Sequence, residues 1–334
     1  MSSEGPPVAL ITGITGQDGT YLAEELSLRG WDVHGLTRPT STVPTHLSAL
    51  PNVQLHRCDM TDLDSVTHAA YSAAPDHVFH LAGASSVWRS WTDPIHTTKV
   101  NAMSVVCLLE ACLRLQDTEG KRLSFVNASS AEIFAGVPAW PQTEDTPIRP
   151  TSPYGASKAF SHLMTQIYRT RGLKTSNAIL YSHESPRRPE TFVTRKITMA
   201  AAAIAKNGQG RLTLGNVDAR RDWGWAPDYV RALIMMAEHP DGDDFIIATG
   251  RDHSVRDFVR LAFEAASVPD WQQYLHTDGA LARVGDAKNL VGDPSKATGV
   301  LGWTPTLDLS QIIARMVDQD LALLEVRPTA DGAH

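Results

Sequence analysis

The sequence predicts an α/β protein built on a doubly wound parallel sheet, with a smaller C-terminal substrate-binding part interleaved with it. Three observations lead to this class. Short apolar runs alternate with longer amphipathic segments over residues 8–180, a rhythm typical of parallel strands with helices on both faces. The first run is followed by glycines at every third position, Gly13, Gly16 and Gly19. The 334 residues are 42% hydrophobic and 20% charged, which suits a globular chain with a sizeable core.

Composition also excludes several classes of protein. The net charge of -7 argues against a nucleic-acid partner. No apolar run is long enough to span a membrane, and the first residues do not have the pattern of a signal peptide. Cys58, Cys107 and Cys112 lie in strand or helix patterns without metal-ligand spacing, so we expect buried thiols in a reducing compartment and no metal site. A cytoplasmic location follows as an expectation.

The first strand, 8–11, and the helix predicted over 21–29 flank the glycine repeat. Glycines let a backbone approach a pyrophosphate at a helix N-terminus, where N–H groups and the helix dipole favour anions. The next strand, 31–36, ends near Arg38, where NAD-binding folds usually place an acidic residue. An arginine there favours the 2′-phosphate of NADP, although a solvated loop arginine is an equal alternative.

The following elements complete the predicted sheet: strand 53–58, helix 62–72, strand 77–82, helix 95–115, strand 123–127, helix 154–171 and strand 175–180. Ligands of such sheets bind at the carboxyl ends of the strands. Asp59, at the end of the third strand, is a candidate adenine contact; otherwise it opens a turn. Asn101 lies inside a helix, where an asparagine is solvated, bends the helix or holds a water.

The candidate catalytic residues are Ser130, Glu132, Tyr154 and Lys158. Tyr154 and Lys158 are four apart and share one helix face. An ammonium beside a phenol favours the phenolate, which predicts a Tyr154 pKa lowered from ~10 toward neutrality. Tyr154 then takes the proton of a sugar hydroxyl that Ser130 orients, and Glu132 is a second acid/base that a simple alcohol dehydrogenase does not need. A plain surface pair is the alternative for the tyrosine and the lysine.

The regular rhythm stops after residue 181. Residues 182–189 are polar, basic and interrupted by prolines, which predicts a binding loop. Arginine pairs at 187–188 and 220–221 predict diphosphate recognition, with ion pairs at a domain or subunit surface as the alternative. Further elements are expected at 194–206, 212–214, 226–238, 245–248, 255–266 and 309–324. We therefore expect a dinucleotide-binding domain at 6–181 with returns near 212–250, a nucleotide-sugar domain at 182–211 and 251–326, and a flexible tail at 327–334.

Together these residues give the chain a family likeness. The relevant stretches are residues 9–19, 130–132 with Tyr154 and Lys158, 183–188, 190–198 and 218–224. With them the chain resembles the extended short-chain dehydrogenase/reductases, which have a Rossmann fold, and within them the GDP-mannose 4,6-dehydratases. The likeness covers nearly the whole chain.

The resemblance implies an internal redox reaction that yields GDP-4-keto-6-deoxymannose. Tyr154 with Lys158 removes the proton of the 4-hydroxyl as hydride passes to NADP, Glu132 takes the proton from carbon 5, water leaves carbon 6, and the hydride returns there. It implies a homo-oligomer, dimer or tetramer. The implied cofactor contacts are Gly13, Thr15, Gly16, Gln17, Asp18, Gly19, Arg38, Asp59, Leu81, Ala82, Tyr154, Lys158, His183 and Arg188. The implied substrate contacts are Ser85, Ser130, Glu132, Ser182, Val193, Lys196, Gly215, Asn216, Arg221, Arg283 and Asp286.

Several positions depart from the family pattern. Ser130 stands where threonine is usual and Ser182 where asparagine is expected, while Ala84, Ser86 and Trp225 replace a glutamine and two histidines. Arg38 has no second arginine beside it in the sequence. These changes keep other substrates and reactions open: a GDP-heptose 4,6-dehydratase, a 5,6-dehydratase or a 4-epimerase. A catalytically silent nucleotide-sugar sensor is a third reading, disfavoured because the catalytic residues are all present.

Overall fold

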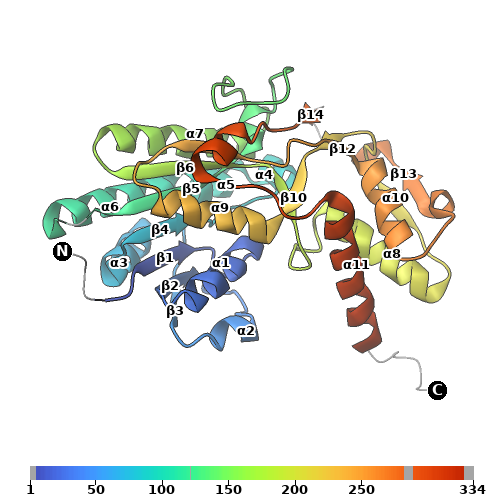
Figure 1. The fold of residues 1–334 in the computed structure, drawn as a ribbon, viewed down its shortest axis with the longest axis horizontal. Helices are drawn as coiled ribbons and strands as arrows, with labels where there is room; N and C mark the ends of the chain where they lie inside the picture. Colours follow the sequence, from blue (N-terminus) through green and yellow to red (C-terminus); the bar gives the residue numbers. More distant parts are fainter. Residues whose placement is uncertain (1–4, 121, 282–288, 327–334) are drawn as a thin grey trace.

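The computed structural model describes residues 5–120, 122–281 and 289–326, and within these ranges seven strands form one parallel sheet (Figure 1). The predicted tail and two predicted substrate contacts, Arg283 and Asp286, lie outside the described residues. The order of the sheet is β11-β6-β5-β4-β1-β2-β3. Its strands are β1 (Val8–Thr12), β2 (Asp32–Thr37), β3 (Val53–Arg57), β4 (His77–His80), β5 (Ser124–Ser130), β6 (Lys174–Leu180) and β11 (Asp244–Ile247).

The strand order reverses once, and this places the ligand crevice. The chain runs from β1 outward through β2 to β3, then crosses back to place β4 on the other side of β1. In doubly wound sheets the ligand binds at such a switch point, beyond the carboxyl ends of the strands. The predicted fold class is confirmed.

Helices cover both faces of the sheet. Successive residues of a strand point to opposite faces, so each face offers apolar side chains to the helices that cover it. Phe79 and Val126 pack toward α1 (Gln17–Leu28) and α9 (Ala226–Glu238). Val78 and Phe125, their neighbours in the chain, pack toward α3 (Leu63–Ala73) and α6 (Ser104–Glu119), with α7 (Pro153–Thr170) on the same face. Both sets are fully buried, which explains why the strands read as continuous apolar runs.

A smaller lobe contains α8 (Val193–Asn207), α10 (Val255–Ala265) and α11 (Leu309–Val326), seen beside the sheet in Figure 1. Its separate core includes Phe258, Phe263 and Ile313. An ion pair between Arg195 and Asp320, both nearly buried, ties α8 to α11. The structure also has three small sheets. They pair β7 (Ser182–Glu184) with β10 (Trp223–Trp225); β9 (Arg220–Arg221) with β12 (His253–Ser254) and β14 (Asn289–Leu290); and β8 (Leu212–Leu214) with β13 (Leu275–Thr277).

Three details differ from the expectation. The loop predicted at 182–189 opens with strand β7, because β10, far along the chain, pairs with it. The first helix begins at Gln17, so the glycine repeat runs into its first turn. The helix predicted at 95–115 is three segments, α5 (Pro94–Thr98), a π-helical turn η1 (Lys99–Met103) that holds Asn101, and α6.

The remaining short elements are α2 (Thr45–Ser48), α4 (Val87–Thr92), η2 (Ala131–Phe134), η3 (Trp271–Tyr274), η4 (Gly279–Leu281) and η5 (Ala297–Leu301). Cys58 and Cys112 are buried, Cys107 is half-buried, and all three are unbridged thiols whose pKa burial raises. None of the helices in the described ranges is long and apolar enough to cross a bilayer.

Candidate active site

The glycine turn after β1 forms one wall of the crevice. Gly13 has a φ of +71°, which favours glycine, and the N–H of Gly16 donates to the Gly13 carbonyl at 2.9 Å. A Cβ on Gly19 would lie 2.4 Å from that carbonyl oxygen, so the first turn of α1 packs directly on the glycine turn. This geometry is compatible with the anion site at a helix N-terminus that the sequence predicts, which stays a prediction.

The same turn contacts the loop after β4. Thr12 Oγ1 accepts from the N–H groups of Leu81 (3.1 Å) and Ala82 (3.0 Å), and a Cβ on Gly13 would lie 2.9 Å from Ala82 Cα. Thr15, half-buried, lies in the turn itself. The predicted contacts Leu81 and Ala82 therefore lie directly beside the glycine turn, at the switch point.

Gln17 and Asp18 tie this turn to β7. Gln17 Nε2 donates to the His183 carbonyl at 3.1 Å, and Ser185 Oγ donates to Gln17 Oε1 at 2.9 Å. The His183 ring donates from Nε2 to Asp18 Oδ2 (2.9 Å) and from Nδ1 to the Tyr181 carbonyl (2.7 Å). Burial opposes the charge on His183, but the Asp18 carboxylate outweighs it and raises the pKa of the ring. Asp18 therefore favours the protonated form of His183.

Arg188 lies on the same side. Its guanidinium stacks on Phe192, 3.8 Å from the ring centroid, and its Nε is 3.3 Å from Glu184 Oε2. That buried Nε has no hydrogen-bond acceptor among the described residues. Glu184 Oε2 accepts its hydrogen bond from Thr194 Oγ1, at 2.7 Å. Arg188 keeps donor capacity for a ligand.

Arg38 and Asp59 follow β2 and β3. Arg38 is exposed, and its Nε donates to Ser41 Oγ at 3.2 Å. Asp59 Oδ1 accepts from both the N–H (2.9 Å) and the hydroxyl (2.8 Å) of Thr61, and these bonds lower the pKa of the carboxyl. Asp59 therefore opens a turn, the alternative considered for it, and its role toward adenine stays a prediction.

The catalytic candidates come together where β5 ends against the start of α7. Ser130 is the last residue of β5, and its hydroxyl accepts from the Glu132 N–H at 3.2 Å and hydrogen-bonds the Tyr154 phenol. Lys158 Nζ donates to the Ala128 carbonyl at 2.8 Å. Ser130, Tyr154 and Lys158 are each less than 9% exposed, while Glu132, on η2, is half-buried.

The pKa predicted for Tyr154 is wrong in direction. Burial raises the pKa of Tyr154 to about 12, the Glu132 charge adds to this, and the Ser130 hydrogen bond and the Arg188 charge oppose it. Burial also lowers the pKa of Lys158 to about 8. Spacing along a helix gives the proximity of two groups but not their desolvation, and desolvation is the larger effect here.

Helix α7 is held in register by a buried polar cluster at its next two turns. His162 lies one turn beyond Lys158, and its Nδ1 is 3.0 Å from Ser129 Oγ, the neighbour of Ser130. Asp244, on edge strand β11, accepts from Gln166 Nε2 (2.6 Å) and Asn177 Nδ2 (3.0 Å).

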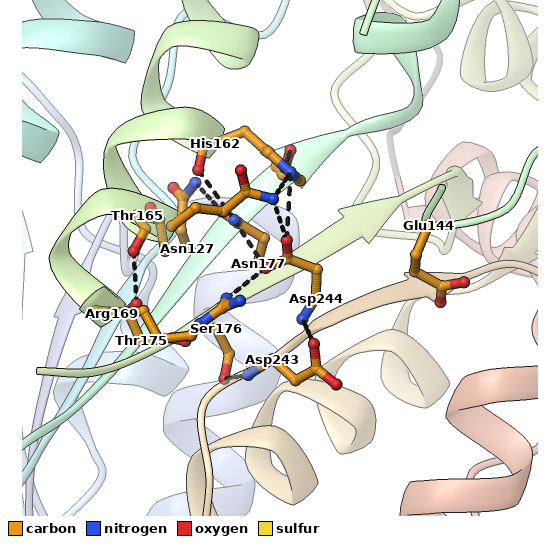
Figure 2. Close-up of polar contacts among 12 residues, drawn as sticks. Asn127, Glu144, His162, Thr165, Arg169, Thr175, Ser176, Asn177, Asp243 and Asp244 are labelled. Atoms are coloured by element: carbon orange, nitrogen blue, oxygen red, sulfur yellow. Dashed lines mark hydrogen bonds and ion pairs between the residues drawn. The ribbon is translucent and has the colours of Figure 1, made fainter. Parts of the chain in front are cut away.

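Figure 2 shows His162, Asn177, Arg169 and Asp244 converging between α7 and the strands. Arg169 completes the cluster with an ion pair to Asp244. Burial alone would raise the pKa of Asp244, but His162 and Arg169 hold it well below its usual range. This network fixes the helix that carries Tyr154 and Lys158 against β5, β6 and β11.

Asn101 completes the support for the crevice. Its Oδ1 accepts from the Ala84 N–H at 2.8 Å, and its Nδ2 donates to Ser157 Oγ at 3.0 Å. It therefore joins the loop after β4 to α7, between Tyr154 and Lys158. Asn101 was noted from the sequence without a role, and His162 was not predicted. The signal for His162 was its place four residues after Lys158, on the helix face that Tyr154 starts.

The predicted substrate residues other than Ser130 and Glu132 lie on four segments. Val193 begins α8, and Lys196 Nζ donates to the Thr213 carbonyl of β8 at 2.7 Å. Asn216, exposed after Gly215, accepts from the Asp218 N–H at 3.0 Å, and Arg221 Nη1 donates to the Arg220 carbonyl at 2.7 Å. Ser85 is exposed in the loop after β4, Ser182 lies in β7, Ser86 caps α4, and Trp225 lies beside Arg315.

In each of the two arginine pairs, 187–188 and 220–221, one arginine forms a surface ion pair and the other is more buried. Arg187 makes a bidentate ion pair with Glu24 of α1, at 2.9 Å for both bonds, and Arg220 pairs with Asp252. These two arginines therefore follow the alternative of surface ion pairs. Their neighbours Arg188 and Arg221 are more buried and are the better candidates for binding an anion. In the part of the chain that the structure describes, no cluster of three or more metal-ligating side chains occurs.

Known proteins support both the fold and the family. The family model described as GDP-mannose 4,6 dehydratase matches residues 10–316. GDP-mannose 4,6 dehydratase 2 of Arabidopsis thaliana is 42% identical, over 95% of this chain and 87% of the relative. The Vibrio cholerae GDP-mannose 4,6-dehydratase is 40% identical, over 95% and 94%. Among solved structures, the Thermus thermophilus UDP-glucose 4-epimerase in complex with NAD has a TM-score of 0.80 at 27% identity, covering 93% of this chain and 98% of that one.

Proposed function

Because this chain belongs to the GDP-mannose 4,6-dehydratase family, we propose that it converts GDP-mannose to GDP-4-keto-6-deoxymannose, a lyase reaction in which NADP is regenerated at each turnover. The observation that carries this proposal is the convergence of Ser130, Tyr154 and Lys158 with Glu132 two residues beyond the serine. A redox step needs the first three. A water elimination needs the additional carboxylate.

The residues fit a nicotinamide dinucleotide. The glycine turn and the start of α1 suit its pyrophosphate, and the buried Arg188 Nε still lacks an acceptor among the described residues. The NAD complex of the Thermus epimerase supports a nicotinamide cofactor, and Arg38 favours NADP over NAD. When bound, the cofactor supplies a hydride acceptor and donor and a positive charge on its nicotinamide ring.

Tyr154 is the base for the sugar 4-hydroxyl. With a pKa near 12 it holds its own proton at neutral pH, so it acts as a base only when nearby positive charge favours the phenolate. Arg188 supplies such charge from the protein, and the Ser130 hydroxyl orients the phenol. Lys158, with a pKa of about 8, remains mostly charged at neutral pH.

Glu132 is the base for carbon 5. That proton becomes acidic only when carbon 4 is a ketone, after Tyr154 has acted. Ser130 ends a strand with an extended backbone, and Glu132 follows on the short turn η2; this closeness in the chain supports a shared role at the same site. The carbon-6 hydroxyl then leaves as water, which gives a double bond between carbons 5 and 6. The hydride taken from carbon 4 would be returned to carbon 6 and a proton to carbon 5, so the product keeps the ketone at carbon 4.

A homodimer is part of the proposal. Helices α4, α5 and α7 pack on one another and expose a shared apolar face that includes Trp88 (61% exposed), Ile95 (71%), Leu163 (46%) and Ile167 (50%). Such a face on the helix that carries Tyr154 suits a symmetric contact with a second copy of this chain. Light scattering should give twice the chain mass for the wild type and the monomer mass for Leu163→Glu; a wild-type monomer contradicts the dimer.

Product analysis tests the reaction. The purified protein with NADP is incubated in D₂O with GDP-mannose and, separately, with other GDP- and UDP-hexoses, and products are identified by mass spectrometry and NMR. GDP-mannose should lose water and gain one deuterium at carbon 5. Glu132→Gln should slow dehydration by ~10²–10⁴-fold while GDP-mannose still binds.

Glu264→Gln, an exposed position on α10, is the matched control and should leave turnover unchanged. Faster dehydration of a UDP-sugar than of GDP-mannose contradicts the substrate assignment. Full turnover and deuterium incorporation in Glu132→Gln contradict the role of Glu132, which would then only shape the turn.

A further inference from the structure

Two arginines lie side by side at the carboxyl ends of β2 and β3. In the parallel pairing of these strands Thr37 is opposite Arg57, and Arg38 directly follows Thr37. The Cys58 N–H donates to the Thr37 carbonyl at 2.8 Å, so the pairing continues one residue past the end of β3. No second arginine follows Arg38 in the sequence, but the strand pairing brings Arg57 next to it.

Arg57 also shapes the loop that carries Arg38. Its Nη1 donates to the carbonyls of Arg38 (2.9 Å), Pro39 (3.3 Å) and Ser41 (2.8 Å). The Arg57 Nε and Nη2 make no hydrogen bond with any described residue, and the same holds for both terminal nitrogens of Arg38. Both side chains are exposed. Nη1 of Arg57 thus holds the loop, while its Nε and Nη2 can still donate hydrogen bonds to a ligand.

Within the described ranges neither arginine has a carboxylate partner. This contrasts with Arg29, Arg187 and Arg220, each paired with an acidic side chain in a protein of net charge -7. Arg38 and Arg57 both contact Ser41 of the same short loop, so their two positive charges lie on one loop without a counter-charge, and an anion bound there would be attracted by both. A phosphate suits such a site because each guanidinium offers a planar set of donors.

The position of Arg38 and Arg57 in the sheet indicates which phosphate of the cofactor they would bind. The glycine turn that suits the pyrophosphate follows β1, and β2 and β3 lie on the side of β1 away from β4 and Tyr154. In dinucleotide folds the end of β2 meets the adenosine ribose. We propose that Arg57 forms the site for the 2′-phosphate together with Arg38 and determines specificity for NADP over NAD. This inference rests on the proposed function, since it concerns the cofactor of that reaction.

Equilibrium binding to the nucleotide-free protein tests it without relying on turnover. Dissociation constants for NADP and NAD are measured by calorimetry for the wild type, Arg57→Gln, Arg57→Lys and Arg38→Gln. Glutamine can still donate to the loop carbonyls but carries no charge. Arg57→Gln should weaken NADP at least tenfold, the size expected for a lost charge-assisted hydrogen bond, and leave NAD within twofold. Arg114→Gln, an exposed arginine on α6, controls for net charge and should change neither constant.

The outcomes separate the inference from its premise. If the wild type binds NAD as tightly as NADP, the NADP assignment itself is wrong. If the wild type prefers NADP and Arg57→Gln keeps that preference, or weakens both nucleotides equally, Arg57 only holds the loop and the inference is overturned. Should the glutamine variant fail to fold, Arg57→Lys decides: one amine cannot serve both three carbonyls and a phosphate, so the NADP preference should fall at least threefold, and an unchanged preference overturns the inference.

Discussion

His80, the last residue of β4, should make the protein sensitive to acid. The ring is fully buried, and its Nδ1 lies 2.9 Å from Thr12 Oγ1. Because that hydroxyl already accepts from the N–H groups of Leu81 and Ala82, it donates its one proton to His80 Nδ1. A second proton on the ring would remove this acceptor and bury a charge. Burial, assisted by the Lys158 charge, lowers the pKa of His80 from 6.5 to about 3.

The sign and size of the effect follow from this difference. A histidine whose pKa is depressed in the folded state contributes stability that is present above pH 6.5 and is lost as pH falls toward 3. At about 1.4 kcal/mol per pH unit the full loss is about 5 kcal/mol, of which about 3 kcal/mol falls between pH 7.5 and 4.5. The affected bonds join Thr12 to the loop after β4, so nucleotide binding should weaken over the same range.

The assay is equilibrium unfolding in urea at pH 7.5, 6.0 and 4.5. His80→Asn keeps an acceptor for the Thr12 hydroxyl and cannot be protonated. It lowers the free energy of unfolding at pH 7.5 by leaving a small cavity, but between pH 7.5 and 4.5 it should lose about 3 kcal/mol less than the wild type. His68→Asn, an exposed histidine on α3, should follow the wild-type pH dependence. If the free energy of unfolding falls equally for the wild type and His80→Asn between pH 7.5 and 4.5, the reasoning is refuted.

Three further outcomes are expected. Because burial lowers the pKa of Lys158 to about 8, the lysine loses its charge as pH rises through 8–9, and kcat should fall over that range. Lys158→Arg should move or abolish this fall. An unaltered pH profile of kcat in the variant means that another group titrates. Arg221→Ala should raise KM for the GDP-sugar about tenfold or more with a smaller change in kcat, measured by steady-state kinetics, and unchanged binding excludes it from the site. His162→Phe removes the bond to Ser129 and should lower kcat about five- to tenfold at constant KM, with His162→Gln restoring part of it; a rise in KM alone contradicts positioning through Ser129.

Much of this protein could be predicted from local sequence patterns. The alternation of apolar runs and amphipathic segments determined the parallel sheet, and strands such as β5 and β6 lie within a few residues of their predicted bounds. The glycine repeat determined the turn after β1, and the four-residue spacing placed Tyr154 and Lys158 on one face of α7. These features depend on neighbours within one or two turns of chain, which the order of residues specifies directly.

Other properties were decided only when distant segments met. β7 exists because β10 pairs with it, and Asp18 takes His183 as a partner across 165 residues. The pKa of Tyr154 rises instead of falling because packing removes water from the phenol, and no spacing rule measures that loss. Arg57 reaches Arg38 because parallel strands end at the same edge of the sheet. Pairing and desolvation depend on the folded surroundings of a residue, so the sequence names the reacting groups while the tertiary structure sets their charges and partners.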